Sequence, residues 1–377
     1  MIAEVLDIQE NCKGIYLQNK FHLEPTDEIL SKVSKTWKFS PVLKDDTKFK
    51  YLFLLTAGRD LKDFSKDVEI YNQTKKTLEA QQKAAITAKM NINECCLFDI
   101  LPEHQLRKWF SIRSSALENL DKKIPVPEDY EILHKIHVLA SNIALQKINY
   151  DGKPGRVIYD IFGSATGRLT TKKGSVPILT LKKEQRFALK PQNDAFVELD
   201  LNAAEIRMLM ALSGKRQPDT DIHEWVSENV FSSQIPRDEV KVKVFSWLYN
   251  FSAPKSRLDE IFSRQIFRDF YLPEKQILST PFGRKLSVDE RKAQNYLLQS
   301  STSDQVLENA YKIQKMIKHT KSKIAFTLHD SIVLDMDKKD VIMLKKIKDQ
   351  FESTRWGKFM STCKIGKDFG SLKEFKI

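Results

Sequence analysis

The stretch from Ala325 to Met336 constrains the fold of this chain more than any other. Its sequence, Ala-Phe-Thr-Leu-His-Asp-Ser-Ile-Val-Leu-Asp-Met, has two runs of β-branched, aromatic and aliphatic residues on either side of a short polar centre. This pattern predicts a β-hairpin that holds Asp330 at its bend. One carboxylate in a turn does little chemistry, so the hairpin alone leaves open an ordinary edge hairpin with a solvated acid.

A second segment has the composition to deliver another carboxylate to the same place. Residues Ala195 to Asp200 are typical of a strand that ends in an acid, and Ala203 to Gly214 of a short helix terminated by glycine. Strand, carboxylate and helix follow in direct succession. The sequence therefore suggests that two distant carboxylates, Asp200 and Asp330, meet.

A stripe of two cations and two aromatic rings lies on one expected helix, which Pro236 opens. Arg237, Lys241, Phe245 and Tyr249 recur every four residues, a spacing that advances by about 40° beyond each full turn and keeps them on one face. Arg and Lys are seldom buried, so this face suits contact with phosphates at one end and stacking of a base at the other. A mixed amphipathic face with no ligand is the alternative.

The remaining organisation is mostly helical. Helices are expected from Tyr71 to Met90, Leu106 to Leu120, Tyr130 to Lys147, Asp289 to Ile317 and Val341 to Phe351, with a break at Pro125 to Pro127. Within the first 65 residues the run from Tyr51 to Leu55 is strand-like, and no catalytic pattern is found there. The Gly-rich, basic segment from Gly152 to Gly174 contains Thr166-Gly-Arg-Leu-Thr-Thr, a turn that can approach a polyanion closely.

Composition limits the class of protein. A chain of 377 residues is long enough for two or three subdomains, and 41% hydrophobic with 30% charged residues excludes disorder as the main state. The net charge is +12, and Lys and Arg recur along the whole chain, which favours a polyanionic partner, with nucleic acid ahead of an anionic membrane. No apolar run approaches the roughly 20 residues of a membrane helix, and no signal peptide is seen, so a soluble, intracellular protein is expected.

The cysteines indicate no disulfide framework and no zinc site. Cys12, Cys95, Cys96 and Cys363 include no Cys-x-x-Cys pair. We therefore expect reduced thiols.

Four of these segments, in their order and spacing, resemble family A (bacterial DNA polymerase I-like) DNA polymerases. The matching positions are Arg237, Lys241, Phe245 and Tyr249 for the Arg-x-x-x-Lys-x-x-x-Phe-x-x-x-Tyr element, Asp200, Glu205 and Arg207 for Asp-Tyr-Ser-Gln-Ile-Glu-Leu-Arg, His329 and Asp330 for His-Asp-Glu, and Thr166 to Leu169 for Thr-Gly-Arg-Leu. The resemblance covers about residues 130 to 377, and it is that of a divergent, phage-type member.

The resemblance implies an α+β fold of the right-hand polymerase type, with an antiparallel-sheet palm, helical fingers and a helical thumb. The implied domains are an N-terminal extension of unknown role (1–65), a thumb (66–150), the first part of the palm (151–215), fingers (216–285) and the second part of the palm (286–377).

The same resemblance implies a role for each matching residue. Two Mg²⁺ ions, for which Mn²⁺ can substitute, would be held by Asp200, Asp330 and the backbone carbonyl of Leu201. Incoming nucleotide would contact His223, Arg237, Lys241, Phe245, Tyr249 and Glu205, of which Glu205 would block a ribose 2′-hydroxyl and Arg237 and Lys241 would also be catalytic. Primer-template DNA would contact Arg168, Thr166, Asn295, Gln299, His329 and Arg284.

Some positions depart from the family pattern. Ser331 stands where the family usually carries Glu, Asn250 replaces a usual Gly, and Asn202-Ala-Ala replaces Ser-Gln-Ile. The acidic ligands of a 3′-5′ exonuclease are not found before residue 130, so a polymerase without intrinsic proofreading is expected.

The implied function is template-directed DNA synthesis from dNTPs on a primer 3′ end. One alternative is a single-subunit RNA polymerase, whose usual His-Asp-Ser element resembles His329 to Ser331 better, although Phe245 and Glu205 argue against it. Another is a catalytically inactive DNA-binding relative. The expected partners are primer-template DNA and dNTPs, with a separate exonuclease or processivity factor as a further candidate. We expect a monomer in the cytoplasm, that of the host if the protein is viral.

Overall fold

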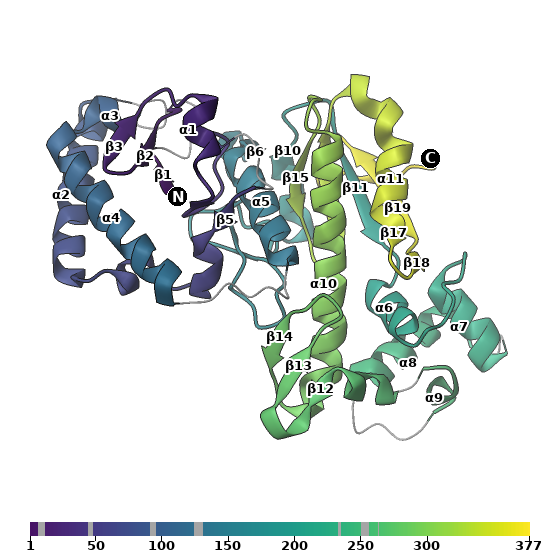
Figure 1. Ribbon diagram of the computed structural model, residues 1–377. Helices are drawn as coiled ribbons and strands as arrows, with labels where there is room; N and C mark the ends of the chain where they lie inside the picture. Colours follow the sequence, from purple (N-terminus) through teal and green to yellow (C-terminus); the bar gives the residue numbers. More distant parts are fainter. Residues whose placement is uncertain are drawn as a thin grey trace. The chain divides into compact units, whose positions relative to one another are not determined.

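The computed structural model describes residues 1–6, 12–43, 48–90, 96–123, 131–232, 235–249, 256–262 and 264–377. The chain divides into two compact units, Met1–Glu128 and Asp129–Ile377, called here the N-terminal and C-terminal units (Figure 1). Three features singled out in the sequence, Cys95, Asn250 and the break at 125–127, lie outside the described residues. The range expected to form a thumb, 66–150, extends across the boundary between the units, and its assignment stays a prediction.

The N-terminal unit is built on a five-stranded sheet with the order β3-β2-β1-β4-β5. Its strands are β1 (Ile2–Val5), β2 (Ile15–Leu17), β3 (Lys20–His22), β4 (Lys35–Thr36) and β5 (Lys50–Tyr51). The first three are antiparallel, whereas β4 and β5 run parallel to β1. Its helices are α1 (Asp27–Ser31), η1 (Leu52–Thr56), η2 (Leu61–Phe64), α2 (Val68–Thr87), α3 (Leu97–Ile100) and α4 (Glu103–Lys123).

The strand expected from Tyr51 to Leu55 is wrong for most of its length. Only Tyr51 belongs to β5, and Leu52–Thr56 forms the 3₁₀ helix η1. The three-residue spacing of Leu52 and Leu55 lets both pack into one cluster with Leu117 and Leu120 of α4, which an alternating strand could not do.

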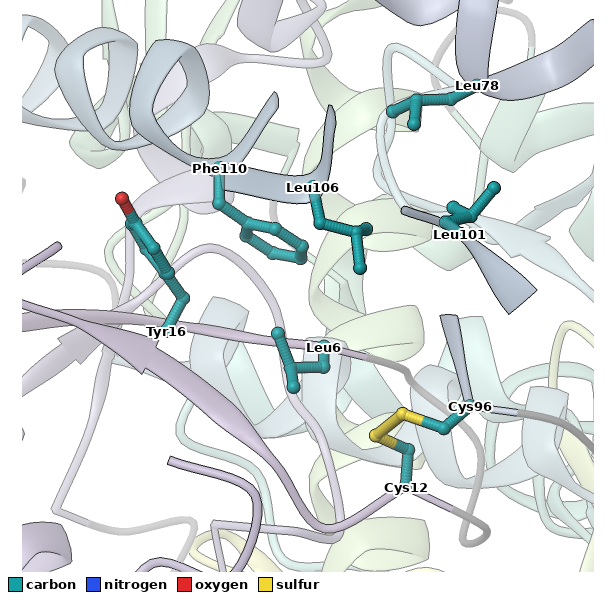
Figure 2. Close-up of a cluster of buried hydrophobic side chains, with 8 residues drawn as sticks. All are labelled: Leu6, Cys12, Tyr16, Leu78, Cys96, Leu101, Leu106 and Phe110. Atoms are coloured by element: carbon teal, nitrogen blue, oxygen red, sulfur yellow. A yellow bond between two sulfur atoms is a disulfide. The ribbon is translucent and has the colours of Figure 1, made fainter. Parts of the chain in front are cut away.

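A second cluster of the N-terminal unit contains a disulfide between Cys12 and Cys96 (Figure 2). The expectation that both thiols are reduced is therefore wrong. The two cysteines are 84 residues apart, and they meet because each lies beside the apolar side chains that bury α4 against the sheet, Leu106 and Phe110 among them. The spacing of the two cysteines along the chain could not predict this disulfide. Cys363, in the C-terminal unit, is a free, buried thiol.

The C-terminal unit is centred on a five-stranded antiparallel sheet with the order β15-β16-β11-β19-β20. The strands are β11 (Ala195–Leu201), β15 (Lys323–Thr327), β16 (Ser331–Met336), β19 (Ser361–Gly366) and β20 (Lys373–Glu374). Helix α10 (Glu290–Met316) packs against α5 (Ile132–Leu145), α11 (Leu344–Glu352) and β15 (Figure 1). The helix and strand expectations for these segments are confirmed within a few residues, as is the mixture of helices and sheet.

Smaller elements complete the C-terminal unit. Its other strands are β6 (Ile148–Tyr150), β7 (Lys153–Gly155), β8 (Tyr159–Asp160), β9 (Thr170–Thr171), β10 (Leu189–Lys190), β12 (Tyr271–Leu272), β13 (Ile277–Ser279), β14 (Lys285–Ser287), β17 (Ser353–Thr354) and β18 (Gly357–Lys358). Its other helices are α6 (Ala204–Leu212), α7 (Ile222–Phe231), α8 (Arg237–Tyr249), α9 (Leu258–Ile261) and the 3₁₀ helices η3 (Lys183–Ala188), η4 (Arg264–Asp269), η5 (Pro273–Lys275) and η6 (Lys338–Met343).

The positive charge of the chain is concentrated in the C-terminal unit. Residues 1–128 carry 20 Lys and Arg against 19 Asp and Glu, whereas residues 129–377 carry 42 against 31. Lysines do recur along the whole chain, but the excess over acids lies almost entirely in the second unit. Within the described residues no helix is long and apolar enough to cross a membrane.

Candidate active site

Two carboxylates from distant parts of the chain lie together where the interior strands β11 and β16 of the C-terminal sheet meet the hairpin bend. Strand β11 pairs with β16 so that Asp200 is opposite Ser331, and the hairpin of β15 and β16 holds Asp330 at its bend. The backbone N–H of Leu201 donates to the carbonyl of Asp330 at 3.1 Å. The hydrogen bonds of the sheet thus fix the spacing of the two acids, and the expected hairpin is confirmed.

Asp200 lies in an environment that disfavours its charge. Burial, the neighbouring carboxylate of Asp330 and that of Glu198 raise its pKa to about 7, and Lys364 opposes the shift. Asp330 itself is exposed. The carboxylates of Asp200, Asp330 and Glu198 therefore carry more negative charge than the nearby Lys364 neutralises.

These groups fit a divalent cation that keeps part of its water. Mg²⁺ is bound through one or two carboxylates together with waters and substrate oxygens, rather than in a cage made only of protein ligands. Asp200 and Asp330 supply two carboxylates, and their uncompensated charge favours a cation. In the described part of the chain no group of three or more His, Cys, Asp or Glu side chains is arranged to hold a metal, so the pair would need other oxygens to complete the coordination.

A pocket adjoins Asp330 and collects residues from five segments of the chain. Its lining is formed by Arg168, Ala203, Ala204, Glu205, Ile206, Phe245, Tyr249, Gln299, Thr302, His329 and Asp330. Each of the four segments that show the family resemblance contributes to this lining. The structure thus brings together six of the expected nucleotide or DNA contacts and one of the two carboxylates.

Glu205 links three elements inside the pocket. Its carboxylate accepts hydrogen bonds from the guanidinium of Arg168, on the turn before β9, and from the hydroxyl of Tyr249, at the end of α8. Burial and this contact with Glu205 raise the pKa of Tyr249. The carboxylate on α6 therefore holds the turn and the end of α8 in place.

The expected stripe of α8 is found on the face of the helix that is not buried. Its buried residues are Val240, Val244, Trp247 and Leu248. The rings of Phe245 and Tyr249 stack with centroids 5.9 Å apart and an interplanar angle of 4°, and both rings line the pocket. An aromatic surface is thus available to a planar ligand.

The expected phosphate-binding residues lie outside the pocket lining. Arg237 donates to Asp221 at 2.8 Å, and Lys241 is exposed on the same helix. His223 is 5% exposed, with Nδ1 3.5 Å from Asp221, and its burial lowers its pKa. A neutral imidazole packed near Phe245, at 6.5 Å between centroids, describes His223 better than an exposed cation.

Two of the expected DNA contacts, Arg284 and Thr166, form internal contacts at the turn that contains Gly167. Gly167 has φ +75°, and a Cβ there would lie 2.1 Å from the guanidinium of Arg284, so only glycine allows this approach. Arg284 forms two hydrogen bonds with buried Asp304, at 2.7 and 3.2 Å. Thr166 is also buried and bonds to Ser164. For Arg284 and Thr166, as for half-buried Asn295, contact with DNA stays a prediction.

Arg207 fixes the backbone beyond the carboxylate strand. Its side chain is fully buried and donates to the carbonyls of Asn202, Pro218 and Thr220 at 2.9 to 3.1 Å. Ala203 lies in the left-handed region, with φ 50° and ψ 50°, where the chain turns from β11 into α6. Arg207 thus ties the end of the strand to the loop that leads into α7.

Glu198 and Lys364 belong to this site and were missed in the sequence. Lys364 Nζ lies 3.3 Å from Glu198 Oε2, opposite it on the neighbouring strand β19. The signal was present, because residues two apart on a strand share a face and Glu198 precedes Asp200 by two. The partner on β19 could be found only with the sheet order.

Comparisons with known proteins give likenesses among solved structures only. No protein-family model and no curated protein matches the sequence. Among solved structures, the chain is similar to the POL domain of Pol1 from M. smegmatis, in complex with DNA primer-template and dNTP. The TM-score is 0.48 and the sequence identity 16%, over 84% of this chain and 70% of that chain.

Proposed function

We propose that the protein is a template-directed DNA polymerase that adds dNTPs to a primer 3′ end. One observation carries the proposal: residues of four segments, chosen from the sequence alone, converge on one pocket beside a pair of carboxylates. Unrelated surface features would have no reason to meet. The strongly basic C-terminal unit, with 42 Lys and Arg against 31 Asp and Glu, adds the charge that a nucleic-acid partner requires.

Asp200 and Asp330, with the carbonyl of Leu201, would hold two Mg²⁺ ions. When bound, such ions neutralise charge on the attacking 3′-oxygen and on the leaving pyrophosphate. The protein then has to position and neutralise rather than supply a nucleophile of its own. The carboxylates serve this purpose because two strands of one sheet hold them at a fixed spacing.

The open face of α8 would receive the incoming nucleotide. Arg237 and Lys241 would neutralise the phosphates, with His223 as a hydrogen-bond donor beside them. Phe245 and Tyr249 would stack on the sugar or base. Glu205, fixed by its two hydrogen bonds, would stand against a ribose 2′-hydroxyl and so disfavour ribonucleotides.

The other side of the pocket would face the primer terminus. Arg168, Gln299 and His329 line it, and they would donate to minor-groove acceptors, which occupy equivalent positions in all base pairs. Contacts of this kind test the shape of a pair without reading its sequence. Thr166, Asn295 and Arg284 are the remaining proposed contacts on this side.

Primer extension tests the proposal directly. The wild-type protein, with Mg²⁺ and dNTPs, should extend a primed template, and Asp330→Asn should lower the rate by at least about 10³-fold because charge neutralisation is lost. Asp337→Asn is the matched control, since Asp337 follows the same hairpin but only caps η6, and it should extend normally. Undiminished extension by Asp330→Asn would contradict the assignment of the carboxylates.

A single-subunit RNA polymerase is the second candidate, because Ser331 follows Asp330. Glu205 opposes it, since a carboxylate there would clash with a 2′-hydroxyl. Extension with equal concentrations of dNTPs and rNTPs separates the two, and efficient ribonucleotide incorporation would favour the second candidate.

We also propose that the protein lacks intrinsic 3′-5′ proofreading. A primer with a mismatched, labelled 3′ end, incubated without dNTPs, should keep its terminal nucleotide. Release of that nucleotide at a rate that survives Asp330→Asn would reveal a separate nuclease site.

A further inference from the structure

We propose that Glu198, held by Lys364, is a positioning residue that supplies negative charge to the divalent-cation site of Asp200 and Asp330 without ligating the ion. The inference rests on the proposed function only through that cation site. It assigns a role to a pair that the sequence analysis did not find.

The sheet register brings Glu198 to the face that carries Asp200. Side chains two residues apart on a strand point to the same face, about 7 Å apart along it. Directly opposite residues also share a face, so Ser331, which pairs with Asp200, lies on this side as well. The face thus holds Glu198, Asp200 and Ser331 in neighbouring positions.

The contacts of Glu198 argue against direct ligation. Its side chain is 11% exposed, and its carboxylate lies 3.3 Å from Lys364 Nζ. Among the described residues no set of three potential ligands is arranged around one point, so Glu198 does not complete a cage with the other two acids. Its effect on the cation is therefore electrostatic, exerted from the neighbouring position on the face that carries Asp200.

Lys364 affects both the stability of the fold and the charge at the cation site. It makes the burial of Glu198 tolerable, because a buried unpaired carboxylate is costly. It also offsets part of the negative charge until a cation arrives, and its 38% exposed side chain is screened by water, so the offset is incomplete. Removal of Lys364 should therefore tighten cation binding while it destabilises the fold.

Mn²⁺ binding to the full chain, without DNA or nucleotide, tests the inference apart from activity. Free Mn²⁺ is measured by electron paramagnetic resonance, and thermal unfolding is measured on the same samples. A carboxylate two residues along the strand from a cation ligand is close enough that Glu198→Gln should weaken binding about five-fold. Lys364→Met should strengthen binding about three-fold by the same reasoning.

Lys323→Met is the matched control. Lys323 is also a strand lysine of this sheet that pairs with a buried acid, Asp335, at 3.8 Å, but Asp335 is paired with Phe196, four residues before Asp200 on β11. It should destabilise the fold much as Lys364→Met does and leave Mn²⁺ binding unchanged. The double variant Glu198→Gln with Ser331→Glu returns a carboxylate to the same face and should recover most of the lost affinity.

The outcomes separate this inference from the proposed function. Asp200→Asn and Asp330→Asn should each abolish Mn²⁺ binding, and binding that survives both would overturn the cation site and the inference with it. If both abolish binding but Glu198→Gln leaves it unchanged, the site stands and the role of Glu198 is wrong. Equal changes in Lys364→Met and Lys323→Met would also overturn it, because they would report stability rather than local charge.

Discussion

Two acids, Glu4 in the N-terminal unit and Asp200 in the C-terminal unit, have opposite surroundings. In the N-terminal unit Glu4 is 2% exposed and forms an ion pair with Arg113, and Ser114 donates to it at 3.4 Å. In the C-terminal unit Asp200 has two other carboxylates as neighbours and a lysine whose charge is directed at Glu198. Removing the cation from a buried ion pair is strongly destabilising, whereas an acid left among like charges is a candidate for a functional role, here the binding of a cation.

Breaking the pair in the N-terminal unit should have the largest effect. Arg113→Met would leave Glu4 buried without its cation, and should lower the free energy of unfolding by about 3 to 5 kcal/mol. Urea denaturation followed by circular dichroism measures this loss. The double variant with Glu4→Gln should recover much of it, and a loss that the second change does not relieve would show that packing, not charge, is responsible.

At Asp200 we expect the opposite effect: removal of its charge should raise the free energy of unfolding. Its pKa is about 7 in the folded protein, against the ordinary 3.8 of an aspartate, so the unfavourable effect of its charge appears as the pH rises from about 4 and is complete above about 7. In the metal-free protein with EDTA, Asp200→Asn should raise the free energy of unfolding at about pH 8 by about 1 to 2 kcal/mol, allowing for partial exposure.

That gain should shrink as the pH falls below 7. Urea denaturation of wild-type and variant protein across this range gives the difference directly, and added Mg²⁺ should remove it by neutralising the wild-type site. A loss of stability in Asp200→Asn at high pH would make Asp200 a structural acid like Glu4.

The smallest change in the free energy of unfolding is expected for the hydrogen bond between Tyr249 and Glu205, which lies in the pocket. Tyr249 donates to Glu205, but its side chain is also accessible, so Tyr249→Phe should lower the free energy of unfolding by about 1 kcal/mol or less. Tyr159→Phe serves as the comparison, because Tyr159 is buried and bonds both to the carbonyl and to the N–H of Thr327. The Tyr159 variant should lose more of its free energy of unfolding. The reverse order would show that the hydrogen bond of Tyr249 mainly stabilises the fold.

Local pattern predicted the elements of the site better than their partners. Alternation and turn residues were enough for β11, the hairpin around Asp330 and helices α6, α8 and α10, because these depend on residues close in the chain. The ion pair of Arg284 with Asp304, the disulfide of Cys12 with Cys96 and the contact of Lys364 with Glu198 were missed, since each joins residues that only tertiary structure brings together. The face of α8 was found from spacing, whereas the burial of His223 was not, because its surroundings come from another helix.

The hydrogen bond from Leu201 N–H to the Asp330 carbonyl has a consequence for how such a chain can change over time. Every residue type except proline can donate through its main chain, so drift at neighbouring positions leaves the separation of the two acids untouched. Ser331 and Asn202 can therefore depart from a sequence motif while the separation of Asp200 and Asp330 stays the same. A site specified by backbone in this way can outlast the sequence similarity by which its ancestry would be recognised.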